Sequence, residues 1–273
     1  MKIAFLWNFS KAKEIYPNWR DGHRAMIEEL GRSNEVSTFL AEDCNKVPDE
    51  YAILLFWTDC NDPIVDKFKD YKAKKVLLLT SDNGLSEHIK SYDLVSCESK
   101  VVFDKVKTYG VKCIQAMATD TEFYRSAIST KDKIKYFYPA TFSPWKLQSS
   151  IAYLGKDLLC VGTVQPDGEK ELKACLDAGV TVLTGYFPAE DIRDYYNRAE
   201  CVVIPAIHGS ERTVLEAMSM NIHLAVNPLN EKACSYIDEY KRSPFKTTRE
   251  FVTDSYNAYK FAGKLLKAIN GEN

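Results

Sequence analysis

The sequence predicts an α/β protein with two doubly wound parallel sheets in tandem. Short apolar runs rich in β-branched residues alternate with longer segments of helical character. In the second half these runs recur about every twenty residues, an interval that fits one strand, one helix and two tight loops. A polar stretch at residues 119–133 interrupts the rhythm between the halves, so the 273 residues are expected to form two modest domains.

The elements follow in order along the chain. In the first half the predicted strands are residues 3–7, 36–40, 52–57, 76–80, 94–97 and 113–116, and the predicted helices are 21–30, 63–71 and 100–109. In the second half the predicted strands are residues 134–138, 158–162, 180–185, 201–205 and 222–227. We expect an N-terminal domain over 1–125, a C-terminal domain over 126–250, and an amphipathic C-terminal helix in 251–273 that crosses back to the first domain.

Composition excludes several classes of protein. Hydrophobic residues make up 45% and charged residues 27%, as in ordinary globular proteins rather than disordered ones. Lys and Arg number 36 against 38 Asp and Glu, so no overall basic field attracts nucleic acid. No apolar run is long enough to predict a transmembrane segment. The eight cysteines are scattered without metal-ligand spacing, which favours free thiols and a cytoplasmic location.

The stretch 201–218 carries the most chemical information. Its apolar strand ends at Pro205, a small polar turn follows, and a helix begins near Glu211 or Arg212 with Ser210 as its N-cap. The free backbone N–H groups at such a helix start, together with the positive end of the helix dipole, favour an anion. The sequence therefore predicts a diphosphate site at this turn.

The same stretch resembles the signature region of retaining nucleotide-sugar glycosyltransferases of the GT-B type, in particular glycosyltransferase family four. The family pattern is a Glu, seven residues, and a second Glu followed by Ala-Met; here Glu216 precedes Ala-Met, and His208 stands at the first position. The resemblance implies two Rossmann-like domains facing across a cleft and a Glu216 carboxylate that holds the donor ribose. It also implies that the donor lies against Gly209, Ser210, Glu211, Arg212 and Thr213. Taken without the resemblance, Glu216 forms a salt bridge to Arg212 on a solvated helix face.

Two further segments resemble the same family. The segment after Gly185 is similar to the one that holds the nucleobase, which assigns Tyr186 to the base; the alternative is an ordinary aromatic at a domain edge. Gly162 and Thr163 resemble a strand end that usually reads Val-Gly-Arg, and Thr163 takes the place of the Arg. The positive charge for the donor phosphates is then expected from Lys170 first, or else from Lys146 or Arg212, although a surface lysine is more often only solvated.

The first domain would receive the acceptor. Arg20 is expected to reach a phosphate or an anionic acceptor, and Gly22 to allow close approach to the donor, unless this segment is simply a capped helix start. Asp82, after an apolar strand, is expected to orient or deprotonate the acceptor hydroxyl, and a turn role is its alternative. With His208, Asp82 is the predicted catalytic pair.

The expected activity is metal-independent transfer of a sugar from a nucleotide donor, a UDP-sugar, to an acceptor hydroxyl with retention. No cofactor is expected, because no Asp-x-Asp motif follows a strand. The acceptor is a saccharide, a lipid-linked molecule or a modified DNA base. Two alternatives are a non-catalytic nucleotide-binding protein of the same fold and a DNA-modifying enzyme that acts on a hydroxylated base. A sugar-nucleotide epimerase is disfavoured because no G-x-G-x-x-G follows the first strand.

Overall fold

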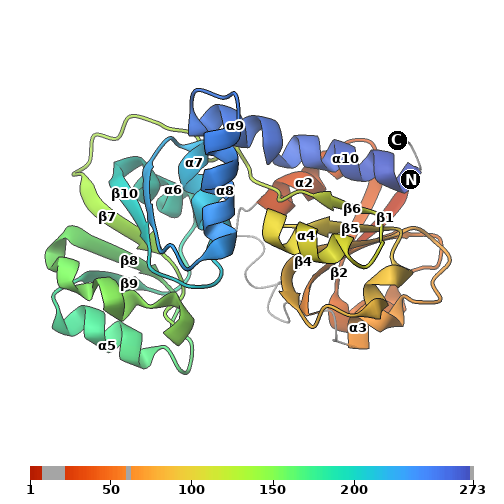
Figure 1. The fold of residues 1–273 in the computed structure, drawn as a ribbon, viewed down its shortest axis with the longest axis horizontal. Helices are drawn as coiled ribbons and strands as arrows, with labels where there is room; N and C mark the ends of the chain where they lie inside the picture. The colour runs from red at the N-terminus through yellow and green to blue at the C-terminus, as the bar shows by residue number, and fades with distance from the viewer. Residues whose placement is uncertain (8–21, 60–62, 271–273) are drawn as a thin grey trace. The chain divides into compact units, whose positions relative to one another are not determined.

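The computed structural model describes residues 1–7, 22–59 and 63–270 of the chain. It forms two compact units (Figure 1): the first is Met1–Asp120 together with Ser255–Asn273, and the second is Thr121–Asp254. Each unit is built on one parallel β-sheet with helices, so the predicted class of two Rossmann-like α/β domains is confirmed. No helix in the described part of the chain combines the length and apolar character that crossing a bilayer requires.

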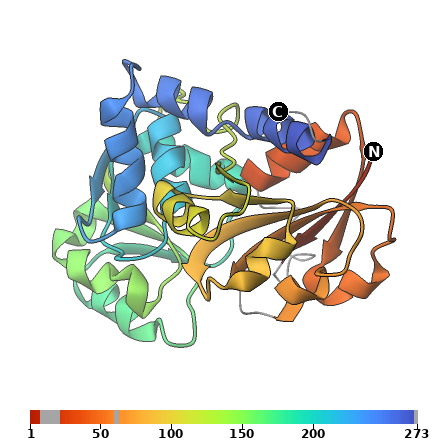
Figure 2. The ribbon, with the colours of Figure 1, turned by 45° about the vertical axis from the view of Figure 1, so that its right-hand side comes forward.

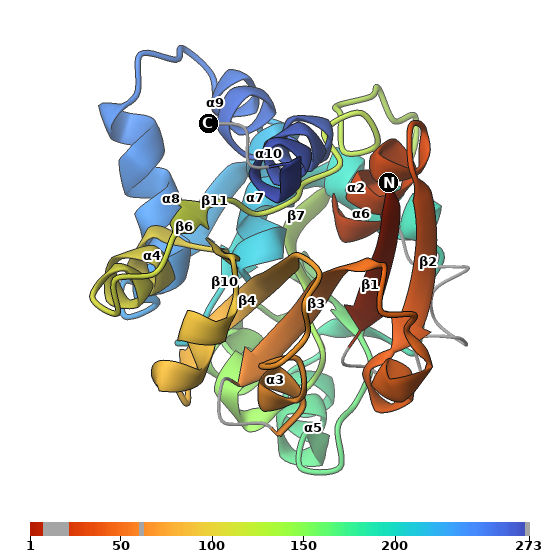
Figure 3. The ribbon, with the colours of Figure 1, turned by 90° about the vertical axis from the view of Figure 1, so that its right-hand side faces the viewer.

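The sheet of the first unit has six parallel strands in the order β2-β1-β3-β4-β5-β6, and Figure 3 shows β2, β1, β3 and β4 side by side. The strands are β1 (Lys2–Trp7), β2 (Glu35–Leu40), β3 (Ala52–Asp59), β4 (Lys75–Asn83), β5 (Leu94–Cys97) and β6 (Cys113–Gln115). The connecting helices are α2 (Gly22–Gly31), the 3₁₀ helices η1 (Ala41–Lys46) and η2 (Glu87–Ser91), α3 (Pro63–Lys67) and α4 (Lys100–Lys107). The two largest differences from the predicted ends are that α3 stops at Lys67 instead of residue 71, and that β4 continues past residue 80 to Asn83.

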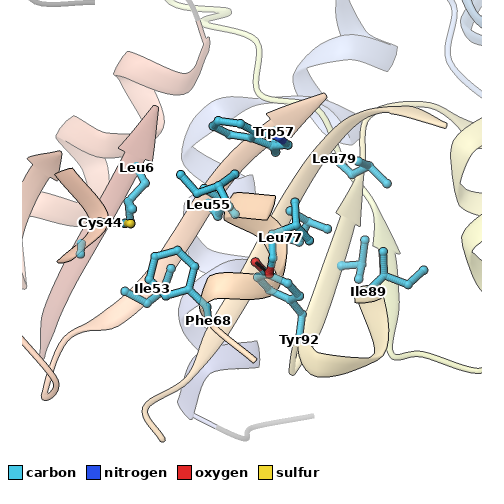
Figure 4. Close-up of a cluster of buried hydrophobic side chains, with 14 of the residues drawn as sticks. Leu6, Cys44, Ile53, Leu55, Trp57, Phe68, Leu77, Leu79, Ile89 and Tyr92 are labelled. Atoms are coloured by element: carbon cyan, nitrogen blue, oxygen red, sulfur yellow. Dashed lines mark hydrogen bonds between the residues drawn. The ribbon is translucent and has the colours of Figure 1, made fainter. Parts of the chain in front are cut away.

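Both faces of this sheet are buried, which explains why its strands are continuous apolar runs. In β1, Ala4 and Leu6 point to a core cluster shared with η1, α3, η2 and α4, whereas Ile3 and Phe5 point to a cluster shared with α2 and the C-terminal helix α10 (Ala258–Asn270). In Figure 4, side chains of the first cluster from β1, β3 and β4 gather on one face of the sheet. Because successive side chains of a strand point to opposite faces of the sheet, alternate residues of one apolar run belong to different cores.

The C-terminal segment returns to the first unit. Two backbone hydrogen bonds join this segment to Thr119, both at 2.9 Å. The Thr119 N–H donates to the Tyr256 carbonyl, and the Ala258 N–H donates to the Thr119 carbonyl. The Gln115 amide also donates to the Tyr256 hydroxyl at 2.6 Å. Beyond this junction α10 lies along α2 (Figure 1) and buries its apolar stripe against it, including Phe261 and Leu265.

The sheet of the second unit has five parallel strands in the order β11-β10-β7-β8-β9. They are β7 (Ile134–Pro139), β8 (Leu158–Gly162), β9 (Thr181–Thr184), β10 (Ala199–Ile204) and β11 (His223–Val226). The 3₁₀ helix η4 (Gln148–Asp157) and α5 (Glu169–Asp177) lie on one face, and α6 (Ala189–Arg198) and α7 (Glu211–Ser219) on the other (Figure 2). Right-handed crossovers require this division. The connections through η4 and α5 lead from β7 to β8 and β9, toward one edge of the sheet, whereas those through α6 and α7 lead to β10 and β11, toward the other edge. Helix α8 (Glu231–Arg242) packs against α7.

A half-buried arginine fixes the edge of the second unit where the chain enters and leaves it. Arg249, on α9 (Thr248–Ser255), donates from its guanidinium to the carbonyl oxygens of Thr121 and Tyr124 at 3.2 Å and of Ser219 at 2.9 Å. These carbonyls lie in the entering segment and at the end of α7. One planar side chain thus joins three segments, which a lysine with its single ammonium would not do with the same geometry.

Gly22 provides a stability test of the first unit. A Cβ atom at this position would lie 1.6 Å from the carbonyl oxygen of Ala118, so α2 begins in direct contact with the backbone after β6. We expect Gly22→Ala to lower the free energy of unfolding by about 2 kcal/mol or more, because the backbone must move to admit the methyl group. Urea unfolding followed by circular dichroism measures the change.

Gly31, at the other end of α2, is the matched control. A Cβ atom there meets nothing within 4 Å, so Gly31→Ala is expected to be neutral or to stabilise by up to about 1 kcal/mol. Equal effects of the two substitutions would contradict the proposed contact.

Candidate functional site

The candidate site is the carboxyl edge of the second sheet. The segments that follow β7, β8, β9 and β10 all start at this edge, because the strands are parallel. Ligands of such sheets bind at this edge, where loops and helix starts collect. The predicted donor-binding residues belong to these four segments or to the first turns of α5 and α7, except Glu216, which lies in the second turn of α7.

A lysine from the β7 segment reaches the start of α7. The Nζ atom of Lys146 donates to the hydroxyl of Ser210 at 2.9 Å, and the Tyr138 hydroxyl donates to the Lys146 carbonyl at 3.1 Å. Burial raises the pKa of Tyr138, and a hydrogen bond with Ser210 opposes part of that rise. The loop carrying Lys146 is therefore anchored by a buried neutral phenol, and its ammonium is held at the helix start.

The turn into α7 uses an unusual backbone. Gly209 and Ser210 both adopt the left-handed conformation, with φ of 73° and 72°. Only glycine does so without strain, so Ser210 carries a cost of about 1 kcal/mol. The Asn230 side-chain amide holds the turn through hydrogen bonds to the carbonyls of Ala206 and Gly209, at 3.0 and 2.9 Å. Backbone strain of this kind, when it is fixed by neighbouring groups, is typical of functional turns.

The predicted capping role of Ser210 was wrong, although the predicted helix start at Glu211 is confirmed. Ser210 occupies the N-cap position, but its side chain makes no capping hydrogen bond and accepts one from Lys146 instead. The first helical bond runs from the Val214 N–H to the Ser210 carbonyl at 3.1 Å, so the N–H groups of Glu211, Arg212 and Thr213 precede it. These groups, the helix dipole and the Lys146 ammonium together favour an anion.

Gly162 and Thr163 join the segments that follow β7 and β8. A Cβ atom on Gly162 would lie 2.2 Å from the Ala140 carbonyl, so this glycine allows the β7 and β8 segments to approach. The Phe142 N–H donates to the Thr163 carbonyl at 2.7 Å, and the hydroxyls of Thr141 and Thr163 share a hydrogen bond of 3.0 Å. Thr163 therefore ties two loops together and brings no charge.

Lys170, His208 and Tyr186 are all exposed. Lys170 lies in the first turn of α5, and the Tyr186 side chain, 70% exposed after Gly185, has a free aromatic face. The structure brings Lys146, Gly209, Ser210 and Glu211 together, and Lys146 was only a secondary choice among the predicted cations. Lys146 and Ser210 are 64 residues apart in sequence. The only sequence signal for Lys146 was its position after a predicted strand.

Glu216 is partly buried against α6. Its Oε2 atom accepts a hydrogen bond from the Tyr196 hydroxyl at 2.9 Å. Burial raises the pKa of Tyr196 well above its usual value, and the Glu216 carboxylate raises it further. The tyrosine stays a neutral donor that fixes one oxygen of the Glu216 carboxylate.

The first unit holds the other predicted residues. Asp82 lies inside β4 and forms an ion pair with Lys105 of α4, while Leu85 donates from its N–H to the Asp82 carbonyl at 3.4 Å at the start of the following turn. Gly22 is in contact with the Ala118 backbone. This contact explains why a glycine is needed at this position without any ligand. Arg20 lies outside the described residues.

A small polar hollow at the carboxyl edge of the first sheet was missed. It is lined by the ends of β4, β5 and β6 and by α2, and its polar side chains include His23, Thr80 and Glu98. His23 and Glu98 are both buried, and the His23 ring packs edge-on against Phe56 with 4.5 Å between centroids. Glu98 directly follows the apolar run of β5. A charged residue directly after a strand was the sequence signal that could have indicated this hollow.

No metal site accompanies these groups. Within residues 1–7, 22–59 and 63–270, no three or more His, Cys, Asp or Glu side chains are grouped so that they would hold a metal ion.

Comparison with known proteins identifies the fold. No family model and no curated protein matches the sequence. Among solved structures, the trehalose-6-phosphate synthase OtsA aligns over 99% of both chains with a TM-score of 0.65 and 7% identity. An alpha-glucosyltransferase in complex with UDP and a 13-mer DNA containing an HMU base aligns over 99% of both chains, with a TM-score of 0.61 and 10% identity.

A third similar structure is AviGT4, a glycosyltransferase involved in avilamycin A biosynthesis. It covers 98% of this chain and 97% of its own, with a TM-score of 0.55 and 13% identity. At these identities the similarity shows the fold alone. The two Rossmann-like units match those of GT-B glycosyltransferases along nearly the whole chain.

The Tyr196–Glu216 hydrogen bond can be tested by its effect on stability. Tyr196→Phe is expected to lower the free energy of unfolding by about 1 kcal/mol at neutral pH, because Glu216 loses its donor. In the wild type the raised pKa keeps Tyr196 protonated when folded, whereas the unfolded chain ionises it above about pH 10. As the pH rises above about 10, ionisation of Tyr196 in the unfolded chain lowers the free energy of unfolding of the wild type. The variant has no hydroxyl at this position and lacks this loss.

The difference between variant and wild type should shrink between neutral pH and about pH 11, as measured by urea unfolding at both. Tyr153→Phe is the control, because Tyr153 is 81% exposed in the same unit. A difference that does not change with pH would count against the raised pKa.

Proposed function

We propose that this protein is a glycosyltransferase that moves a sugar from a nucleotide donor, a UDP-sugar, to an acceptor hydroxyl with retention and without a metal ion. One observation carries the proposal: the Lys146 ammonium is hydrogen-bonded to Ser210 at the N-terminus of α7. The GT-B fold supports it, since solved glycosyltransferases share that fold over nearly the whole chain.

The proposed chemistry depends on stabilising the leaving group. The acceptor oxygen bonds to the anomeric carbon while the bond from that carbon to the diphosphate oxygen breaks, and the diphosphate gains charge as it leaves. A fixed ammonium and the N–H groups at the start of α7 would stabilise that charge without a metal ion. The acceptor proton passes to the departing diphosphate or to Asp82.

The remaining assignments follow the positions of the side chains. Glu216, held by Tyr196, would bind the ribose hydroxyls, and the exposed Tyr186 would lie against the base. His208, exposed in the same turn as Gly209, would lie near the transferred sugar. We place the protein in the cytoplasm, in keeping with its free thiols.

Two other functions remain as alternatives. Thr163 and His208 stand at two positions that carry Arg and Glu in the family it resembles, which favours a non-catalytic nucleotide-binding protein. A DNA-modifying enzyme acting on a hydroxylated base is favoured by the similar structure solved with UDP and HMU-containing DNA. The net charge of -2 gives that alternative no general electrostatic support.

Substitution of the lysines tests the phosphate site. Lys146→Met is expected to weaken UDP binding about tenfold or more, because a charge-assisted hydrogen bond to phosphate is lost. Lys170→Met, at the exposed position on α5, is expected to have a smaller effect. Titration calorimetry with UDP measures both.

Lys173→Met is the matched control for these variants, since Lys173 lies on α5 in an exposed ion pair with Asp177. A larger loss of affinity for Lys170→Met than for Lys146→Met would refute the assignment of the cation.

A donor screen tests the activity itself. The wild-type protein is incubated with UDP-sugars and GDP-sugars, and released UDP or GDP is measured. We expect UDP release from a UDP-sugar, by slow transfer to water when no acceptor is present. Binding without turnover of any sugar nucleotide would favour the non-catalytic alternative, and acceleration by duplex DNA with a hydroxymethylated base would favour the DNA-modifying one.

A further inference from the structure

Tyr138 is a buried polar residue next to the proposed phosphate site, and the proposed chemistry does not use it. It lies near the carboxyl end of β7, and its side chain is completely buried. Its hydroxyl donates to the Lys146 carbonyl at 3.1 Å. Burial of a hydroxyl is costly unless it is hydrogen-bonded, so the bonds that Tyr138 makes must account for its place here.

Three hydrogen bonds connect Tyr138, Lys146 and Ser210 in a closed ring. The Lys146 Nζ atom donates to the Ser210 hydroxyl at 2.9 Å, and the Tyr138 hydroxyl donates to the Lys146 main chain. The third bond joins the hydroxyls of Tyr138 and Ser210. It opposes the rise in the Tyr138 pKa that burial causes, as a bond donated to the phenol oxygen does. The ring therefore runs from the lysine ammonium through two hydroxyls to the carbonyl of the same lysine.

The ring fixes the lysine at both ends of its side chain. Tyr138 holds the main chain of Lys146, and Ser210 holds its ammonium. A lysine side chain has several rotatable bonds and loses much rotamer freedom when it is fixed. Because the ring fixes the side chain during folding, less of this entropy is lost when a phosphate binds. An ammonium has three N–H donors, so it can bind a phosphate while it keeps the bond to Ser210.

The backbone at Ser210 supports a role for its hydroxyl. Ser210 has a φ of 72°, in the left-handed region that favours glycine, and its side chain does not cap α7. A strained residue persists where its neighbours hold it in place. Here the preceding residue, Gly209, leaves room for the lysine, since a Cβ atom on it would lie 2.7 Å from the Lys146 Nζ atom. The ring thus gives a reason for a serine where a glycine would be less strained.

We infer that Tyr138 is a positioning residue of the phosphate site: through Ser210 and the Lys146 carbonyl it holds the Lys146 ammonium at the start of α7. The inference rests on the proposed function and deepens it, because it assigns the placement of the cation to a buried side chain that does not touch the donor. The phenol acts only through the lysine. Its removal should therefore have no effect on the ligand once the lysine is replaced.

A double-mutant cycle tests this dependence. UDP dissociation constants are measured by titration calorimetry for the wild type, Tyr138→Phe, Lys146→Met and the double variant. Tyr138→Phe is expected to weaken UDP binding about fivefold, because the ammonium is no longer held in place. In the Lys146→Met background the same substitution should change the dissociation constant by less than about twofold. A loss of the same size in both backgrounds would overturn the inference, since it would show a general loosening of the sheet.

Ser210→Gly is the second variant, which tests the ring even if Tyr138→Phe folds poorly. Glycine adopts the left-handed conformation without strain, so this variant should be about as resistant to urea as the wild type, or more so. It lacks the hydroxyl, so it should still weaken UDP binding about threefold or more. Stability and affinity then change independently, which a merely structural serine would not produce. An unchanged UDP affinity in Ser210→Gly would contradict the ring.

Tyr136→Phe is the matched control, because Tyr136 lies on the same strand two residues closer to its amino end. It should leave UDP binding unchanged, and a loss equal to that of Tyr138→Phe would count against the inference. A Tyr138→Phe variant that binds UDP as the wild type does, while Lys146→Met binds it less tightly, would refute the inference alone. A wild type that binds no UDP, or a Lys146→Met variant that binds it normally, would refute the proposed phosphate site itself.

Discussion

The close backbone approach between the β7 and β8 segments determines the geometry of the candidate site. Gly168 lies so near the Phe142 carbonyl that a Cβ atom would be 2.0 Å from its oxygen, and Gly162 is in the same relation to Ala140. Phe142 is bonded on both sides, to the Thr163 carbonyl at 2.7 Å and from the Gln165 N–H at 3.1 Å. With the chain after β7 held in this way, the short 3₁₀ turn that follows carries Lys146 to the start of α7. Larger residues at either glycine would separate the two segments and move the ammonium away.

The site illustrates how a charge can be supplied from a neighbouring loop. The segment after β8 has a threonine where the family pattern has an Arg, and a lysine from the segment after β7 lies at the start of α7. Parallel strands deliver all their carboxyl-end loops to one edge, so a positive charge can move between adjacent loops while the ligand position stays the same. At the start of α7 the helix dipole, the N–H groups and one ammonium all contribute positive potential, regardless of which strand precedes the lysine.

Much of the fold could be predicted from the sequence, because its strands are buried on both faces and read as apolar runs. The strand starting at residue 76 was visible for that reason, but its continuation through Asp82 was not, since the pairing with β3 is irregular and the residues are polar. The helix start at Glu211 followed from local turn chemistry. The hydroxyl of Ser210 could not be placed, because a lysine 64 residues earlier competes for it. The ion pair of Asp82 with Lys105 is equally non-local, and patterns of spacing contain no information about such contacts.

The return of the C-terminal helix has a consequence for the order in which the protein is made. The apolar faces of α2 and of the first sheet are completed by α10, whose residues are the last described ones of the chain. A ribosome releases the N-terminal strands long before it releases this helix, and the second unit is synthesised in between. Until α10 is synthesised, the apolar faces of α2 and of the first sheet stay exposed. Exposed apolar surface of this kind binds chaperones and promotes aggregation. The first unit is begun before the second unit and completed after it.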